Sequence, residues 1–405
     1  MEEQDHRVIA RRMDLFHQQE EGPGMIFWHP RGFAVYQLIE AEIRRHMRAA
    51  GFAELRTPQL LDRALWEASG HWQKFSEAMF VFEDGEQQKA LKPMSCPGHV
   101  QVFKSRLRSF RDLPLRYCEF GACMRNEPSG ALLGLMRTRA FVQDDAHIFC
   151  LEEQVEDQVA KFCRLLKAIY ARFGFDDVAV GLSMRPAERA GDDAVWDRAE
   201  DMLAVAATAA GLDFKLQPGE GAFYGPKLEF VLRDNKGRAW QCGTIQIDLV
   251  MPERLDAAYT DSDGKQRRPV MLHQAVLGSI ERFMGVLLEH HAGKLPFWLA
   301  PDQVLVASIG PAQADYAEEV AADLNAEGLR AVTDVRPERL AKKIVDARQL
   351  GIPRFAVVGS SEAAGKAVSL RRDDGESEVL PVAKLVELLR SHELQKPPPS
   401  RAMTV

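Results

Sequence analysis

Apolar and polar residues alternate most clearly between Arg116 and Cys150, where two extended runs flank a turn-rich segment. That segment is Asn126–Gly130, in which proline and glycine interrupt any helix. Alternate residues of a strand share one face, so one face of the second run is either solvated or the wall of a polar pocket. The spacing alone leaves both interpretations open. The residues on this face are Arg137, Arg139, Phe141, Gln143, Asp145 and His147.

Helical and extended patterns also precede this stretch. Residues 5–20 have a helical pattern, and a short apolar run follows at 25–28. Apolar residues then recur at helical spacing over 35–50, and Gly51 is a good stop for that helix. The strand that follows is predicted to end at Thr57–Pro58.

The middle of the chain mixes short helices and strands. Pro97 suits the first turn of a helix that begins at Cys96. Residues 151–215 are predicted to form two helices around one strand. The Asp234–Gly237 segment is typical of a hairpin turn. Further on, a short strand at 269–273 is predicted to run into a helix at 278–283.

Residues 293–301 are the best candidate for a domain boundary. Beyond them β-rich runs alternate with helical runs, which predicts a separate α/β domain with a mixed sheet. The tail from Lys396 is rich in proline and is predicted to be disordered. The β-rich runs are 304–309, 329–335, 354–359 and 366–372, and the helical runs are 312–327, 338–350 and 381–394.

Composition restricts the class of protein. A chain of 405 residues is long enough for about two or three domains. The net charge of −7 argues against a general polyanion binder, so a nucleic acid would have to meet a local basic patch. The six cysteines form no C-x-x-C pair, so the sequence suggests neither a zinc ribbon nor a disulfide framework. An acidic N-terminus and the lack of a long apolar run predict a cytoplasmic protein without membrane contact.

Three segments in order resemble the signature motifs of class II aminoacyl-tRNA synthetases. The helix and strand that end at Pro58 are similar to motif 1, and residues 120–141 are similar to motif 2. Gly278, Glu281 and Arg282 have the spacing of motif 3. The continuation FVQDDAHIFC resembles the threonyl-tRNA synthetases in particular, and the likeness runs from about residue 5 to about residue 390.

This resemblance implies a fold and a quaternary structure. We expect an α+β class II catalytic domain over 1–295, in which helices flank an antiparallel sheet. An α/β anticodon-binding domain is expected over 296–395, followed by a disordered tail over 396–405. Motif 1 implies a homodimer. Residue 5 already corresponds to the start of the catalytic core, whereas many bacterial members first carry an N-terminal editing domain. We therefore expect this chain to lack that domain and to be unable to clear seryl-tRNA.

The resemblance also assigns a metal site. Cys96, His147 and His273 stand where the family carries its zinc ligands, one Zn²⁺ per chain, although no spacing rule would select them. Taken singly, a cysteine at a helix start is more often a small buried residue. One thiolate and two imidazoles suit Zn²⁺ and leave a coordination position open. Threonine could chelate that metal through its amino and hydroxyl groups, whereas valine could not.

The implied reaction joins threonine to ATP and then to the 3′ end of tRNA(Thr). By resemblance, Arg125 holds the α-phosphate and the carboxylate, and Glu127 holds the adenine amino group. Arg137 and Arg282 hold the outer phosphates together with Mg²⁺, and His71 lies near the terminal ribose and assists transfer. The expected amino-acid and adenylate contacts are Gln143, Asp145, Tyr224, Gln241 and Gln246.

Two alternatives stay open beside threonyl-tRNA synthesis. One is a paralogue that activates an amino acid for a carrier other than tRNA or serves as an inhibitor-resistant copy. The other is a catalytically silent tRNA-binding protein, which the complete motif arginines and metal ligands disfavour. Leu133, Gln274 and Pro337 depart from the usual His, Arg and Asn of the family. These departures concern charging efficiency and the choice of tRNA more than activation.

Overall fold

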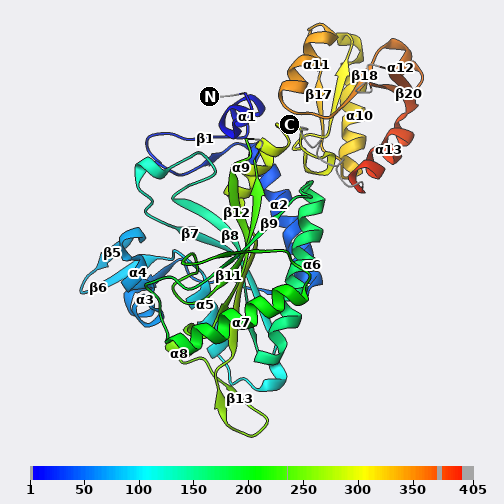
Figure 1. Cartoon of the computed structure of the whole chain (residues 1–405). Helices are drawn as coiled ribbons and strands as arrows, with labels where there is room; N and C mark the ends of the chain where they lie inside the picture. The colour runs from blue at the N-terminus through cyan, green and yellow to red at the C-terminus, as the bar shows by residue number, and fades with distance from the viewer. Residues whose placement is uncertain (1–2, 235, 372–375, 395–405) are drawn as a thin grey trace.

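The computed structural model describes residues 3–234, 236–371 and 376–394 (Figure 1). A large body carries the first three quarters of the chain, and a smaller body carries the C-terminal part. The tail predicted to be disordered, 396–405, lies outside the described residues. Among the described helices, none combines the length and apolar character needed to cross a bilayer.

An eight-stranded sheet organises the large body, in the order β10-β9-β11-β12-β15-β8-β7-β3. The six inner strands pair antiparallel, and the outermost pair at each edge is parallel. This confirms the predicted antiparallel sheet for its central strands. The strands are β3 Ala53–Glu54, β7 Leu115–Met124, β8 Ala140–Cys150, β9 Ala179–Ser183, β10 Lys215–Gln217, β11 Lys227–Arg233, β12 Ala239–Asp248 and β15 Val270–Ser279.

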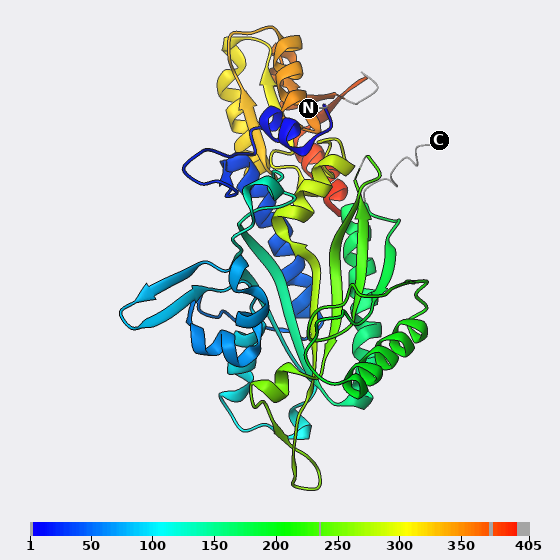
Figure 2. The same ribbon diagram turned by 60° about the vertical axis from the view of Figure 1, so that its left-hand side comes forward.

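Long helices cover one face of this sheet, as Figure 2 shows. They are α2 Pro30–Ala49, α6 Val155–Phe173, α7 Asp193–Ala209 and α9 Ile280–His290. Ile39 and Ile43 of α2 are buried together with Ala146 and Ile148 of β8 in one core. The alternate residues of β8 face away from the helices, so that face is left for polar side chains.

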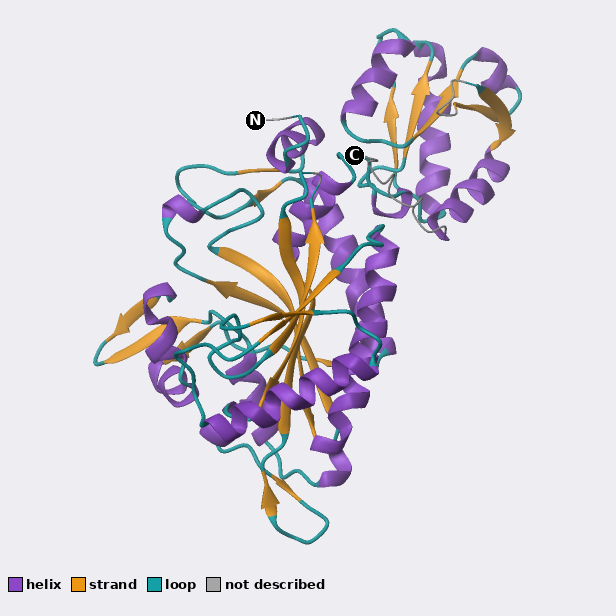
Figure 3. Ribbon diagram, in the orientation of Figure 1, coloured by secondary structure: helices purple, strands orange, loops and turns teal. Residues whose placement is uncertain are grey.

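Shorter elements stand on the other side of the sheet or, in the case of the hairpin of β13 and β14, extend from its lower end in the view of Figure 3. They are β4 Leu60–Asp62, α3 Arg63–Ser69, α4 His71–Phe75, β5 Val81–Asp84, β6 Gln87–Leu91, α5 Cys96–Lys104, α8 Met251–Arg254, β13 Tyr259–Thr260 and β14 Gln266–Arg267. Pro97 lies in the first turn of α5, as predicted. Cys96 therefore sits at the very start of a helix that is packed against the sheet.

Several sequence predictions were wrong in extent. Helix α1 covers only His6–Met13, because Asp14 adopts a left-handed conformation at φ 57° and ends it. Strand β1, Phe16–His17, then pairs with β2, Phe27–Trp28. The strand expected at 269–273 continues as β15 to Ser279, and α9 follows it directly.

The smaller body is a five-stranded mixed sheet in the order β17-β16-β18-β19-β20. The first three strands are parallel and the last two are antiparallel, which confirms the predicted mixed α/β architecture. Helix α12 and strand β20 were not predicted. The elements are β16 Val304–Ser308, α10 Ala314–Ala326, β17 Ala331–Asp334, α11 Leu340–Gln349, β18 Arg354–Val358, α12 Ser360–Ala364, β19 Ala367–Arg371, β20 Ser377–Pro381 and α13 Val382–Leu394.

Arg31, at the start of α2, connects the two bodies. Its guanidinium donates to the carbonyl of Met13 at 2.9 Å and to the carbonyl of Leu350 at 2.6 Å, and it forms an ion pair with Asp302. Trp298 meanwhile packs into the core of the large body. The division at residue 295 stays a prediction, but the junction around it is tightly bonded.

We predict that Arg31→Met destabilises the whole chain. The substitution leaves Asp302, whose side chain is 18% exposed, without its ion pair, and it also removes two hydrogen bonds to carbonyls. We expect a loss of about 2–4 kcal/mol in the free energy of unfolding, measured with denaturant. Lys161→Met breaks an exposed pair with Asp157 and should cost less than about 1 kcal/mol. Equal losses in the two variants would contradict the connecting role of Arg31.

Candidate active site

A cavity of about 590 Å³ lies on the face of the eight-stranded sheet opposite the long helices. Strands β8, β12 and β15 form its floor, and the loops after β7 and before β11 form its sides. Every residue predicted for substrate, ATP or metal lines this cavity except His71. These residues are Cys96, Arg125, Glu127, Arg137, Gln143, Asp145, His147, Tyr224, Gln241, Gln246, His273 and Arg282.

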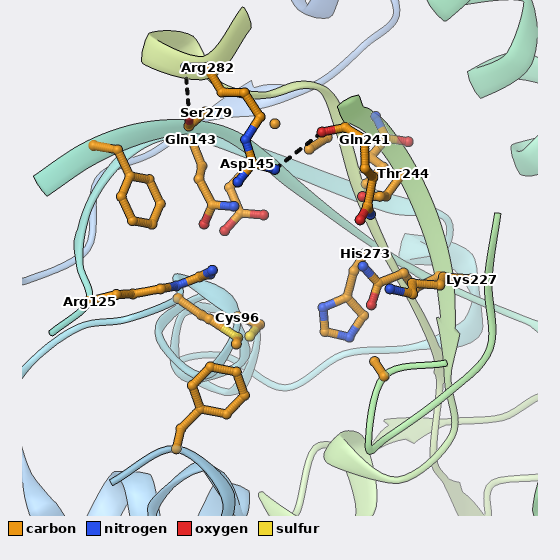
Figure 4. Close-up of a pocket in the computed structure, with 18 of the residues that line it drawn as sticks. Cys96, Arg125, Gln143, Asp145, Lys227, Gln241, Thr244, His273, Ser279 and Arg282 are labelled. Atoms are coloured by element: carbon orange, nitrogen blue, oxygen red, sulfur yellow. Dashed lines mark hydrogen bonds between the residues drawn. The ribbon is translucent and has the colours of Figure 1, made fainter. Parts of the chain in front are cut away.

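Two arginines from different motifs face the same space (Figure 4). Arg125 donates to the carbonyl of Pro93 at 3.2 Å and lies over the ring of Phe141. Arg282 donates to the carbonyls of Met136 and Gln241, at 3.0 and 3.3 Å. These bonds use Nε of Arg125 and Nε and Nη1 of Arg282, so the other terminal nitrogens of the pair can clamp an anion from two sides.

The cavity is electrostatically prepared for that anion. Burial lowers the pKa of Arg282, and the positive charges of Arg137 and Arg125 lower it further. Arg137 is half exposed and lies 3.8 Å from the carboxylate of Glu127. Three guanidinium groups thus line one cavity, and one of them, that of Arg137, lies near a carboxylate, which favours a polyphosphate.

The opposite end of the cavity is polar but more enclosed. The hydroxyl of Tyr224 donates to Oε1 of Gln246 at 2.8 Å, and its ring stacks on His273 with centroids 4.8 Å apart. Burial raises the pKa of Asp145 above its usual range. A carboxylate, an amide and a phenol in a small enclosed space suit the amino and hydroxyl groups of a small ligand.

A group of metal-ligand type forms the base of this polar end. Nε2 of His147 lies 3.1 Å from Nδ1 of His273, and the thiol of Cys96 completes a set whose ligand atoms all lie within 4.8 Å of one another. All three side chains are buried. One thiol and two imidazoles converging in this way fit a zinc ion, with room on the cavity side for a further ligand.

The outer nitrogens of both histidines are already bonded. Nε2 of His273 lies 2.9 Å from Asp248, whose other oxygen accepts two backbone N–H groups. Nδ1 of His147 lies 2.8 Å from Nδ1 of His99. The other ring nitrogen of His99, Nε2, lies 3.2 Å from the carboxylate of Glu119. Burial alone would raise the pKa of Glu119, but hydrogen bonds from His99, Lys92 and the Thr57 backbone lower it to about 2.

His71 is the one predicted site residue that the structure does not place on the cavity surface. It is fully buried, with Nδ1 2.8 Å from the hydroxyl of Ser69 and Nε2 3.8 Å from the sulfur of Cys96. Burial lowers its pKa to about 3. A role at the terminal ribose stays a prediction.

A second set of metal-type side chains lies outside the cavity, at Asp5, His6 and Glu289. There Nδ1 of His6 lies 2.8 Å from the Glu289 carboxylate, and Nε2 accepts the backbone N–H of Leu135 at 3.1 Å. Both nitrogens of the imidazole are thus used. This cluster ties α1 to α9 and to the motif 2 loop, and it is structural.

Sequence reasoning missed Asp144, which points from β8 to the helix side of the sheet. Its carboxylate accepts the backbone N–H groups of Val276, Leu277 and Gly278 at 2.8 to 3.1 Å. Burial raises its pKa to about 7 although these bonds oppose the shift. The carboxylate thereby holds the irregular segment of β15 that leads into Arg282. The signal was present, because an acidic residue interrupts an otherwise apolar strand face.

Gly278 is required in the same segment. Its φ is +78°, and a Cβ there would lie 2.8 Å from the carbonyl oxygen of Cys242. Any side chain would therefore push β15 away from β12. The glycine of the motif is explained by this close approach.

The three departures from the family pattern have different surroundings. Leu133 packs against the main core and exchanges backbone hydrogen bonds with Arg137 at 3.1 and 3.3 Å, so it closes the loop that carries that arginine. Gln274 is buried, and its Nε2 has no hydrogen-bond partner. Pro337 is exposed after β17.

Two family models match the chain. One, described as the tRNA synthetase class II core domain (G, H, P, S and T), matches residues 79–291. The other, described as an anticodon binding domain, matches residues 303–392. The boundary between these matches falls at the junction around Arg31 and Asp302.

Similar proteins carry matching names. A threonine–tRNA ligase of Cupriavidus pinatubonensis is 55% identical over 390 residues, which are 96% of this chain and 61% of that protein. The threonine–tRNA ligase of Burkholderia multivorans is 52% identical over 390 residues, again 96% of this chain and 61% of that protein. The chain thus spans about three fifths of the length of these curated relatives.

Solved structures agree with these names. The RNA binding domain of threonyl-tRNA synthetase from Cryptosporidium parvum is 41% identical, with a TM-score of 0.93, and the match covers 97% of this chain and 99% of that one. A prolyl-tRNA synthetase of Giardia lamblia, 18% identical with a TM-score of 0.75, covers 96% of this chain and 78% of its own. That second likeness is one of fold alone.

We predict that Glu281 makes stability depend on pH. Its carboxyl accepts the backbone N–H of Val142, and burial raises its pKa to about 8. Because the folded state holds this proton more tightly than the unfolded state, its stabilising contribution is complete below about pH 4.5 and is lost as pH rises toward 8. The free energy of unfolding of Glu281→Gln should therefore rise relative to that of the wild type as pH increases over this range, by at most about 1.4 kcal/mol per pH unit.

The measurement is denaturant unfolding of both proteins at several pH values. Glu318→Gln, an exposed change on α10, should stay close to the wild type at every pH. A difference between Glu281→Gln and the wild type that does not change with pH would contradict the prediction.

Proposed function

This chain belongs to the class II aminoacyl-tRNA synthetases, within their threonyl-tRNA synthetase family, and we propose that it forms threonyl-adenylate from threonine and ATP and transfers the threonyl group to tRNA(Thr). One observation carries the proposal. The arginines expected to hold ATP and the polar residues expected to hold threonine line the same cavity, with the metal-type group at its base.

Activation would depend on position and charge more than on acid–base chemistry. The carboxylate of threonine is already a nucleophile, so it needs only to be aimed at the α-phosphorus of ATP. Arg125 lies between the two ends of the cavity and would hold both the carboxylate and the α-phosphate (Figure 4). Arg137 and Arg282 would hold the β- and γ-phosphates with Mg²⁺, and Glu127 would accept from the adenine amino group. Neutralised charge on the leaving pyrophosphate lowers the barrier.

Selection of threonine would use the polar end of the cavity. A zinc ion held by Cys96, His147 and His273 would offer its open positions to the amino and hydroxyl groups of threonine. Asp145 can also accept from the amino group, and the bonded Tyr224 and Gln246 close the space around the side chain. Valine lacks the hydroxyl, and loss of a required polar contact is costly.

Transfer would bring the 3′ end of tRNA to the same cavity while the smaller body holds the anticodon. The match of residues 303–392 to an anticodon-binding family supports tRNA as the acceptor in preference to another carrier. We place the reaction in the cytoplasm, where tRNA is used for translation.

We further propose that the chain acts as a homodimer through the side formed by α2, β2 and β3. Strand β3 is an edge strand of the eight-stranded sheet. Phe33, in the first turn of α2, is 45% exposed and lines a second hollow of about 410 Å³. Apolar residues line much of that hollow, among them Ile26, Trp28, Phe33, Tyr36, Leu91 and Met124. A second copy of the chain would cover this apolar surface.

The test of the function is a pair of assays on the purified chain. Threonine should support exchange of pyrophosphate into ATP, and valine should not. Serine should support slower exchange, because it retains both chelating groups and lacks one methyl, a difference worth about 10–200-fold. Charging of transcribed tRNA(Thr) should follow. Exchange without charging would favour a carrier other than tRNA, and the absence of both would refute the proposal.

We predict that Arg125→Lys lowers kcat and kcat/KM together in the exchange assay. A lysine cannot form the paired bonds of a guanidinium or lie over Phe141 in the same way, and the lost contact is strongest in the transition state. We expect a decrease of about 100-fold or more, as for other transition-state donors. Arg44→Lys is the matched control, because Arg44 also lies over a phenylalanine ring, that of Phe120, and neither of these two residues lines the cavity. A change confined to the KM for ATP would show that Arg125 has another role.

The homodimer gives a separate prediction. Phe33→Asp places a charge in the proposed interface and should convert dimers to monomers in light scattering. Leu107, 97% exposed on the loop after α5, provides the control Leu107→Asp, which should remain dimeric. A dimer that survives Phe33→Asp would exclude this surface.

A further inference from the structure

A buried chain of hydrogen-bonding groups runs away from the cavity behind His147. It passes from His147 to His99 and then to Glu119, and Lys92 and Thr57 bind the far side of Glu119. All five side chains are buried, none of them more than 5% exposed. Isolated charges are costly at such depth, so this arrangement needs a reason beyond packing.

The distances define which groups are hydrogen-bonded to one another. Nδ1 of His147 and Nδ1 of His99 are 2.8 Å apart, and Nε2 of His99 lies 3.2 Å from Oε2 of Glu119. Lys92 donates to Oε1 of Glu119 at 2.8 Å and to the hydroxyl of Thr57 at 2.9 Å. That hydroxyl donates to Oε2 at 2.8 Å, and the Thr57 backbone N–H donates to Oε1 at 3.0 Å.

When both histidines are neutral, only one direction of donation fits an ionised Glu119. A carboxylate accepts, so the proton of neutral His99 must lie on Nε2, and Nδ1 of His99 then accepts. Its partner, Nδ1 of His147, must therefore carry a proton. Neutral His147 then has its lone pair on Nε2, the nitrogen that faces His273 and Cys96. The opposite direction would place a lone pair of His99 against the carboxylate and a proton on the ligand nitrogen of His147.

We propose that Glu119, acting through His99, is a positioning residue that sets the tautomer of His147 and thereby makes its Nε2 available to zinc. The inference rests on the proposed zinc site. The other histidine of that site is oriented by a carboxylate without an intervening imidazole, because Nε2 of His273 lies 2.9 Å from Asp248. An orienting partner on the outer nitrogen is common at metal sites, and its loss typically weakens metal binding about 10–100-fold.

The near-isosteric change Glu119→Gln tests the direction of donation. Lys92 can only donate, so it holds the amide oxygen on its own side, and the amide NH₂ group then faces His99. Nε2 of His99 must now accept, its proton moves to Nδ1, and His147 is forced to carry its proton on Nε2. We expect the Kd for zinc to rise about 10–100-fold, measured by competition with a chromogenic chelator.

Two substitutions of His99 separate direction from packing. His99→Gln offers an oxygen to His147 and an N–H to Glu119, so it can keep the native direction and should hold zinc more tightly than His99→Leu. The leucine leaves the N–H of His147 without an acceptor. Cobalt(II) bound to the wild type and to His99→Gln should show the visible absorption of a thiolate–imidazole site. Glu119→Gln and His99→Leu should bind cobalt(II) more weakly and show less of this absorption.

The matched control is Glu200→Gln. Glu200 is also buried and bonded to a cation, Arg185, but that cluster lies outside the cavity lining. Glu200→Gln should lower the stability of the chain and leave the Kd for zinc unchanged. If Glu119→Gln fails to fold, shown by its thermal unfolding, the comparison of the two His99 variants decides. Wild-type zinc affinity in Glu119→Gln, or equal affinities in both His99 variants, would overturn the inference. A wild-type chain that binds no zinc would instead refute the metal site itself, and the inference with it.

Discussion

The direct pairing of His147 with His273 across antiparallel strands β8 and β15 is the constraint on which the site depends. Residues paired in this way project from the same face of a sheet, so their rings meet wherever the register holds. A shift of either strand by one residue would turn the ring of its histidine into the helix-covered core and separate the pair. The register therefore has to be held firmly, and the buried core on the other face of β8 supplies part of that restraint.

Asp144, which lies between the site residues Gln143 and Asp145 on β8, supplies the rest of the restraint on the register of β8 and β15. Its carboxylate collects the N–H groups of Val276, Leu277 and Gly278 where β15 departs from regular pairing with β8. Beyond that irregularity the chain enters α9 and presents Arg282 to the cavity. One carboxylate on the core face thus links the register of the histidines to the position of an arginine about a turn of helix away.

Much of this could be predicted from the sequence, for identifiable reasons. The alternation along β8 placed Gln143, Asp145 and His147 on one face, since a strand has period two. The same reasoning failed for Arg139, which precedes the strand, is not among the lining residues and donates to the backbone carbonyl of Glu127. Helix α1 stopped early because Asp14 takes a left-handed conformation, after which the chain enters β1 and pairs with β2.

The residues that support the site were harder to foresee than those that line it. His99, Glu119 and Asp248 come from α5, β7 and β12, Lys92 follows β6, and no spacing relates the four residues. Their meaning depends on burial and on what each atom faces, which only the fold determines. Three buried carboxylates illustrate this: Asp144 is bonded by backbone N–H groups, Asp248 by backbone and one imidazole, and Glu119 by an imidazole and an ammonium. Each carboxylate holds in place a different residue or segment that borders or supports the cavity. Since a buried acid without such partners would be neutral or destabilising, their presence ties the stability of the sheet to the geometry of the site.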